Sequence, residues 1–186
     1  GIITNIGPDH LEFFRSMDMS AQAKAELLDF LPANGTAILN ADDSYYDYLA
    51  ARARCRVVSF GLSAKADVRA MNLASDKRTG TIFQLMLPGK VRRTSVRIRV
   101  QGEHNISNAL AAAAVGTVLG LSGSAIAQGL SRFRPADMRS QVCVCRGIKL
   151  IIDCYNANPA SMKAAVQLLA QIRAKGKKIA VIGDML

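Results

Sequence analysis

Short apolar runs alternate with helix-like segments through the first third of the chain, and this order restricts its fold more than any other feature. The runs GIITNI, TAILN and CRVVSFG are rich in β-branched residues and have the length of buried strands. Between them lie SAQAKAELLDFL, for which Ser20 is the expected cap, and ADDSYYDYLAARAR, which opens with the acidic residues that a helix dipole favours. This order predicts a mostly parallel α/β sheet with crossover helices.

The pattern changes after these runs. ADVRAMNLASD, GTIFQLMLPG and RRTSVRIRVQG are extended runs separated by turn residues, which predicts a small antiparallel sheet. Helices are expected in HNISNALAAAAVGTVLG and SGSAIAQGLSRF, and the polar, proline-containing RPADMRS follows them. We therefore expect a domain boundary near residues 136–140, which gives domains 1–137 and 138–186.

The second domain returns to the α/β order. QVCVCRGIKLIID predicts a hairpin that turns at Arg146 and Gly147, SMKAAVQLLAQIRAKG a helix, and KIAVIGD a further strand. The chain begins at Gly1 without a methionine and stops at VIGDML, so we expect a piece of a longer protein.

Composition narrows the class of protein. Half of the 186 residues are hydrophobic and a fifth are charged, as in soluble globular proteins, and no apolar run is long enough to span a bilayer. The four cysteines and two histidines lack the spacing of a zinc site, so we expect reduced thiols in a cytoplasmic protein.

The net charge of +10 allows nucleic acid, an anionic membrane surface or phosphorylated substrates as partners. In VRRTSVRIRV, however, arginines alternate with apolar residues, which is the pattern of a strand with one solvated face. The chain has no tryptophan and no aromatic residues interleaved with its basic ones. These observations favour a solvated face over nucleic-acid binding.

Lys24 stands at the head of a helical apolar pattern that continues at Leu27, Leu28 and Leu31. Burial disfavours the charged form of an amine, and a neutral lysine can act as a nucleophile or take up carbon dioxide as a carbamate that binds a hard cation. The spacing alone favours the alternative, a lysine at the helix edge whose amine reaches solvent.

His10 follows the first apolar run, with Asp9 and Glu12 beside it. Loops at the carboxyl ends of strands hold ligands in α/β proteins, so this histidine is a candidate metal ligand. The alternative is a polar surface residue.

Two further stretches are rich in asparagine. Asn105 and Asn108 share one face at the first turn of a helix, where they could cap it or bind the edge of an adenine. DCYNANPASMKAA, which starts at Asp153, follows an apolar run and precedes a helix. It is either a turn with a helix cap or a ligand site at a strand's carboxyl end.

Taken together, TNIGPDHLE, AKAELLDFLPANGTAILNADD, GEHNISNALAAAA, IIDCYNANPASMKAA and AVIGDM resemble the Mur ligases of peptidoglycan synthesis. The resemblance covers nearly the whole chain in the right order. It implies a central ATP-binding domain followed by the start of a Rossmann-like C-terminal domain. The wording YNANPASMKAA is similar to the member of the family that adds D-alanyl-D-alanine.

The resemblance implies a monomeric, cytoplasmic ligase that uses ATP and Mg²⁺ to join D-alanyl-D-alanine to a UDP-N-acetylmuramoyl tripeptide through an acyl phosphate. Two alternatives remain. One is another ligase of the superfamily, of the folylpolyglutamate or cyanophycin synthetase type, and the other is a non-catalytic remnant that still binds a nucleotide.

The resemblance also assigns roles to residues of this chain. Metal binding falls to His10 and to Lys24 as a carbamate, which makes Lys24 catalytic as well. Contacts with ATP fall to His104, Asn105, Asn108, Arg139, Asp153 and Asn158, and a place near the reacting groups falls to Tyr155 and Asn156.

The chain departs from the family in several places. No GxxxxGK[ST] phosphate loop occurs in it, so we expect that loop, the metal-binding glutamate after it and the UDP-binding domain before Gly1. Cys154 stands where serine is more usual. Without the phosphate loop we expect this stretch of chain alone to be inactive.

Overall fold

The computed structural model describes residues 1–7, 14–76, 80–90, 93–134, 136, 138–139, 141–174 and 176–183. The chain divides into two compact units, Gly1–Phe133 and Arg134–Leu186. We call them unit 1 and unit 2 and describe each by itself. Among the described residues, no helix has both the length and the apolar character needed to cross a membrane.

Unit 1 contains a six-stranded sheet in the order β1-β2-β3-β4-β5-β6. The strands are β1 (Ile2–Ile3), β2 (Thr36–Asn40), β3 (Arg56–Gly61), β4 (Val68–Asp76), β5 (Gly80–Met86) and β6 (Thr94–Ile98). The first four strands pair in parallel, and β5 and β6 continue the sheet as an antiparallel meander. The predicted parallel order and the predicted meander are both confirmed, and they belong to one sheet.

The parallel pair β3 and β4 is joined by only a short link, although parallel neighbours normally need a long crossover. The link suffices because the two strands overlap only at their ends, where Phe60 pairs with Val68 and Gly61 with Arg69. Ser59 and Asp67 tie the link together, since the Ser59 amide and hydroxyl both donate to Asp67 Oδ2, at 2.8 Å and 2.7 Å.

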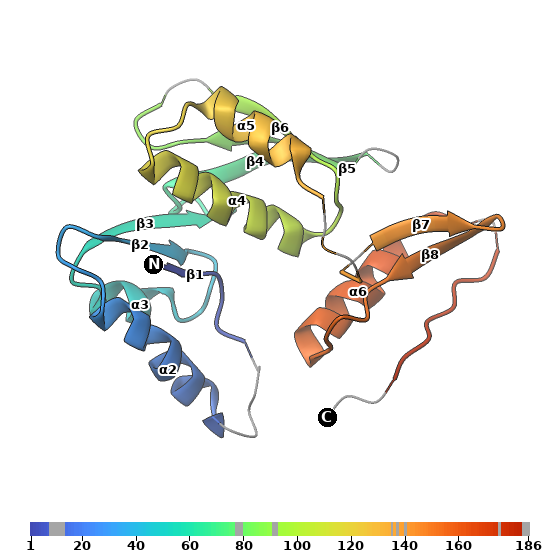
Figure 1. Cartoon of the computed structure of the whole chain (residues 1–186), viewed down its shortest axis with the longest axis horizontal. Helices are drawn as coiled ribbons and strands as arrows, with labels where there is room; N and C mark the ends of the chain where they lie inside the picture. The colour runs from blue at the N-terminus through green and yellow to red at the C-terminus, as the bar shows by residue number, and fades with distance from the viewer. Residues whose placement is uncertain are drawn as a thin grey trace. The chain divides into compact units, whose positions relative to one another are not determined.

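Helices cover both faces of this sheet (Figure 1). One face packs against α2 (Met17–Asp29) and α3 (Tyr46–Arg52), and the other against α4 (Glu103–Val118) and α5 (Gly123–Arg132). Alternate residues of one strand therefore enter different cores, as Leu39 and Ile38 do. The small residues of α4 allow close packing, and a Cβ on Gly116 would lie 2.9 Å from Ile126 Cγ1.

The start of α2 differs from the prediction. Ser16, and not Ser20, is the N-cap, and its Oγ accepts a hydrogen bond from the Met19 amide at 3.2 Å. Ser20 instead lies within the helix and is fully buried. The helix therefore begins one turn earlier than predicted, and Asp18 falls in its first turn, where the helix dipole favours an acid. Packing in the core buries Ser20, so it does not act as the cap.

Unit 2 contains the hairpin of β7 (Gln141–Cys145) and β8 (Ile148–Ile152), followed by α6 (Pro159–Gln171). Arg146 and Gly147 both have positive φ, +48° and +79°, as a two-residue type I′ turn requires. The predicted hairpin turn is therefore confirmed. The helix that was expected to continue to residue 176 ends at Gln171.

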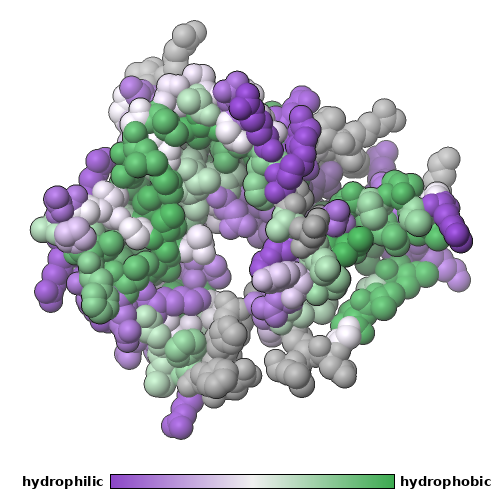
Figure 2. Space-filling view, viewed as in Figure 1, coloured by the Kyte–Doolittle hydropathy of each residue, from purple (hydrophilic) through white to green (hydrophobic). Residues whose placement is uncertain are grey.

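The strand predicted in KIAVIGD is wrong for its described residues, 178–183, none of which is in a strand. A strand exists through hydrogen bonds to a neighbour, and the described strands β7 and β8 pair only with each other. Val181 is 95% exposed, and apolar side chains gather on the surface of unit 2 (Figure 2).

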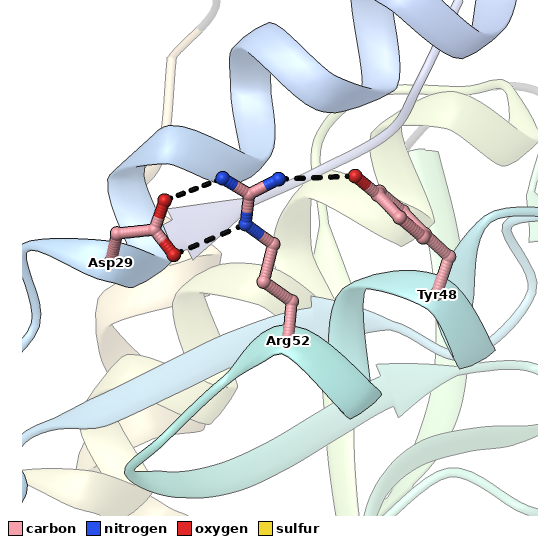
Figure 3. A network of polar contacts seen from close by, with 3 residues as sticks. All are labelled: Asp29, Tyr48 and Arg52. Carbon is pink, nitrogen blue, oxygen red and sulfur yellow. Dashed lines mark hydrogen bonds and ion pairs between the residues drawn. The ribbon is translucent and has the colours of Figure 1, made fainter.

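Figure 3 shows the polar contact that joins α2 to α3. The Arg52 guanidinium donates through Nε and Nη2 to both carboxylate oxygens of Asp29, and through Nη1 to the Tyr48 hydroxyl at 3.1 Å. The hydrogen bonds from Arg52 lower the pKa of Asp29 below its ordinary value. The pair is exposed, so its effect on stability is small.

We predict that Arg52→Gln raises the pKa of Asp29 toward its ordinary value, because the fork of charged donors is lost. A lowered folded-state pKa contributes stability that is present at neutral pH and lost as the pH falls through that pKa. The substitution should therefore remove part of the acid dependence of unfolding. NMR titration of the Asp29 carboxyl measures it, with Arg56→Gln, at the exposed start of β3, as the matched control. An unchanged pKa in Arg52→Gln would contradict the prediction.

Candidate functional site

The loop after β2 ties the carboxyl ends of the parallel strands together. Asn40 Nδ2 donates to the Thr4 carbonyl at 3.0 Å, and Asp43 Oδ2 accepts from the Ile6 amide at 2.7 Å. Both contacts fix the segment that leaves β1. Asp43 also accepts from the Tyr45 amide at 2.8 Å, which sets the turn into α3.

Asp42 fixes the exit of β3 in the same way. Its carboxylate accepts from the amides of Leu62 and Ser63 at 2.6 Å and 2.9 Å. The approach leaves no room for a side chain at Gly61, where a Cβ would lie 2.7 Å from Asp42 Oδ2. The exits of β1, β2 and β3 are thus held by side chains at the end of β2 and in the loop after it. From the sequence, the acidic residues of this loop were predicted only to open a helix. The sequence signal for this arrangement is NADD, which begins at the last residue of β2.

Lys24 lies at the edge of the buried stripe of α2, which consists of Ser20, Ala21, Ala25 and Leu28. Leu27, which was placed on the apolar face with Lys24, is 41% exposed, because the stripe follows one helix face and Leu27 falls outside it. Lys24 as a whole residue is half-buried, and its Nζ donates to the Asn5 carbonyl at 3.4 Å. This places the amine at the exit of β1, the strand that His10 was predicted to follow.

His10 itself, with Asp9 and Glu12, lies outside the described residues. Among the residues that are described, no group of three or more histidine, cysteine or acidic side chains could hold a metal ion. All four cysteines are free thiols.

The start of α4 brings His104 and Asn105 together. Asn105 Nδ2 lies 2.8 Å from the Gln101 carbonyl, to which it donates, and 3.0 Å from His104 Nε2. The N-cap is Gly102, with φ of +101° and no side-chain cap, so capping by asparagine is wrong here. Asn108 lies on the next turn with its side chain exposed. Figure 1 shows α4 beginning on the side of unit 1 where β2 and β3 end.

In unit 2, Asn158 is the N-cap of α6. Its Oδ1 accepts from the Ser161 amide at 2.7 Å, while the Asn158 amide donates to Ser161 Oγ at 3.0 Å, which completes a capping box. Pro159 is the first helical residue. Asn156 Oδ1 accepts from the Ala157 amide at 2.9 Å. The turn-and-cap interpretation of the asparagine-rich stretch is therefore confirmed.

Tyr155, in the same stretch, contacts an arginine that precedes β7. The Arg139 guanidinium carbon lies over the Tyr155 ring, 4.3 Å from its centroid. The Tyr155 amide donates to the Met138 carbonyl at 3.2 Å. Asp153, just after β8, is half-buried, and Cys154 is exposed. The predicted residues of unit 2 thus gather between the exit of β8 and the start of α6, together with the segment that enters β7.

Comparison with known families gives two matches that follow this division of the chain. Residues 1–116 match the Mur ligase middle domain, and residues 138–186 match the Mur ligase, glutamate ligase domain.

Individual proteins show the same similarity. The UDP-N-acetylmuramoyl-tripeptide–D-alanyl-D-alanine ligase of Bacillus subtilis is 34% identical over 100% of this chain and 39% of its own length. The UDP-N-acetylmuramate–L-alanine ligase of Stenotrophomonas maltophilia K279a is 41% identical over 88% of this chain and 35% of its own length. The chain therefore spans about two-fifths or less of these curated relatives.

Solved structures agree on the fold. MurF from Acinetobacter baumannii has a TM-score of 0.84 and 34% identity, over 91% of this chain and 37% of its own. MurF ligase from Thermotoga maritima, solved in complex with ADP, has a TM-score of 0.79 at 20% identity, over 91% of this chain and 38% of its own.

We predict that Gly61→Ala destabilises the chain by about 1–3 kcal/mol, because the new methyl group displaces the Asp42 carboxylate from the amides that it accepts from. Thermal or urea unfolding measures the change. Gly129→Ala is the matched control, since a Cβ there meets nothing within 4 Å and alanine favours the helix. Equal stability of the wild type and Gly61→Ala would contradict the prediction.

We also predict that Asn158→Ala costs about 1 kcal/mol of stability and that Asn158→Asp costs little, because aspartate caps a helix as well as asparagine does. Urea unfolding of both variants separates a cap from other roles of this side chain. An Asn158→Asp variant as unstable as Asn158→Ala would show that the acceptor oxygen is not what matters.

Proposed function

The chain belongs to the Mur ligase family, and from this premise we propose that the protein is an ATP-dependent ligase of peptidoglycan precursor synthesis. It joins D-alanyl-D-alanine to the terminal carboxylate of a UDP-N-acetylmuramoyl tripeptide. We propose further that it acts in the cytoplasm as a monomer, with which its four free thiols are compatible.

The observation that carries the proposal is similarity along the whole chain to relatives that bear this activity in their names. The stretch YNANPASMKAA supports the choice of member, and it lies at the exit of β8 and the start of α6. This stretch alone would be weaker support than similarity along the whole chain, because the helix cap accounts for part of its sequence.

Several described residues fit a nucleotide. The Arg139 guanidinium forms no ion pair with any described carboxylate, so its charge is available to a phosphate group. The exposed Asn108 amide has the donor and acceptor that the edge of an adenine requires. We propose ATP contacts for these two residues and for His104, Asn105, Asp153 and Asn158.

When bound, ATP supplies the phosphoryl group that turns the substrate carboxylate into an acyl phosphate. The amine of D-alanyl-D-alanine then attacks the acyl carbon, and inorganic phosphate leaves. The task of this chain's cationic groups is to offset the negative charge that develops on the phosphate oxygens. Arg139 serves that task in unit 2. The Tyr155 ring lies under the Arg139 guanidinium, and Asn156 is the next residue of the β8–α6 connection.

Lys24 and His10 are the proposed contributors to magnesium binding. The Lys24 amine lies at the exit of β1, where it donates to the carbonyl of Asn5, which precedes His10 in the sequence. A carbamate on this amine would give two oxygen ligands, which Mg²⁺ prefers. The carbamate is also what would make Lys24 catalytic.

A second candidate function is ligation of L-alanine to UDP-N-acetylmuramate, because the Stenotrophomonas maltophilia ligase of that name is 41% identical to this chain. The two candidates differ in both substrates. A substrate comparison therefore separates them, and it also separates both from a non-catalytic remnant or a ligase of folylpolyglutamate or cyanophycin type.

We predict that the full-length protein releases phosphate from ATP only when UDP-N-acetylmuramoyl tripeptide and D-alanyl-D-alanine are both present. Lys24→Ala should lower that rate by about tenfold to a hundredfold, because the proposed carbamate on Lys24, a ligand of Mg²⁺, is lost. Lys65→Ala is the matched control, since Lys65 is an exposed lysine in the link between β3 and β4. A coupled phosphate assay measures all three proteins.

Other outcomes of that assay would overturn the proposal. Phosphate release that requires UDP-N-acetylmuramate and L-alanine would favour the second candidate. No release with any acceptor would leave a nucleotide-binding remnant, and an unimpaired Lys24→Ala would remove the proposed role of the carbamate.

A further inference from the structure

We infer that Tyr155 is a positioning residue that holds the Arg139 guanidinium ready for the phosphates of ATP. The inference rests on the proposed function, which assigns Arg139 to the nucleotide. It assigns to Tyr155 a role through another side chain, in place of direct contact with the reacting groups.

The backbone fixes both partners before their side chains meet. The Tyr155 amide donates to the Met138 carbonyl at 3.2 Å, so the segment before β7 is tied to the exit of β8 at the residue next to Arg139. The Arg139 amide donates to the Ala136 carbonyl at 3.2 Å, which closes a turn on the other side. Arg139 is therefore held at a turn, one residue from a tertiary hydrogen bond.

The side-chain contact then uses the face of the ring. The guanidinium carbon lies 4.3 Å from the ring centroid, within the range of a cation–π attraction. A contact of this kind restrains the guanidinium without occupying its N–H donors, which lie in the guanidinium plane. Tyr155 is 65% exposed, so the ring is held at the surface, where a ligand can reach the arginine.

Arg52 shows what the alternative looks like in the same chain (Figure 3). Its Nε, Nη1 and Nη2 atoms all donate to Asp29 or to the Tyr48 hydroxyl, so its hydrogen-bonding capacity serves the packing of α2 on α3. Arg139 has no ion pair with a described carboxylate, and its tyrosine offers the ring face instead of the hydroxyl. One arginine is committed to structure, and the other is restrained with its donors available.

The test compares Tyr155→Leu with Tyr155→Phe in the full-length protein, because phenylalanine keeps the ring face and leucine removes it. We expect Tyr155→Leu to raise the KM for ATP about two- to fivefold, the effect of losing one exposed cation–π contact. Tyr155→Phe should match the wild type. Tyr48→Leu is the matched control, since it removes another exposed tyrosine that contacts an arginine, and it should leave the KM for ATP unchanged.

A double-mutant cycle shows whether Tyr155 acts through Arg139. In an Arg139→Ala background, Tyr155→Leu should have no further effect on the KM for ATP. An equal effect in both backgrounds would overturn the inference, and so would a Tyr155→Phe variant as impaired as Tyr155→Leu, which would point to the hydroxyl.

A readout without ATP keeps the inference separate from the proposed function. The Cδ protons of Arg139 should show an upfield ring-current shift by NMR in the wild type and in Tyr155→Phe, and lose it in Tyr155→Leu. Absence of that shift in the wild type would overturn the inference. If the wild type shows the shift but does not turn over ATP, the proposed function fails, and the role of Arg139 toward ATP fails with it. If the wild type turns over ATP normally and Tyr155→Leu leaves the KM for ATP unchanged, only the inference fails.

Discussion

The hydrogen bonds accepted by the loop after β2 are the constraint on which the rest of unit 1 depends. Parallel strands leave unpaired backbone groups at their carboxyl ends, and Asp42 and Asp43 accept from amides in the exits of β3 and β1. Asn40 adds a donor to the β1 exit. Because these three side chains lie at the end of β2 and in the short loop after it, they hold the exits of β1 and β3 to the exit of β2. Lys24 thus meets a backbone segment that is already held in place.

Unit 2 shows how one polar stretch can serve structure and function at once. Asn158 caps α6, which fixes where the helix begins after the exit of β8. In the same connection, the Tyr155 amide donates to the Met138 carbonyl, and the Tyr155 ring lies under the Arg139 guanidinium. One short connection thus holds both a helix cap and residues for which we propose a role near ATP.

Local signals predicted most of the fold. The alternation of apolar runs, the Arg146–Gly147 turn and the cap in YNANPAS all depend on residues close in sequence, and all were found. The failures have a common cause, since Ser20 and KIAVIGD needed knowledge of distant neighbours. Ser20 is buried by packing, and 178–183 has no described strand to pair with. The bonds of Asp42 to Leu62 and Ser63 also join segments far apart in sequence, so composition could only suggest polar residues at a strand end. The placing of Lys24 on an apolar face was approximate, and His10 stays a prediction.

We propose that this chain belongs to an enzyme that activates a carboxylate with ATP, and isotope labelling tests this directly. The most direct measurement gives the full-length protein a UDP-N-acetylmuramoyl tripeptide labelled with ¹⁸O in its terminal carboxylate, together with ATP and D-alanyl-D-alanine. We expect one labelled oxygen to leave in each inorganic phosphate as the amide forms, because the amine attacks the acyl carbon and displaces phosphate. Unlabelled phosphate, or label retained wholly in the peptide, would contradict it.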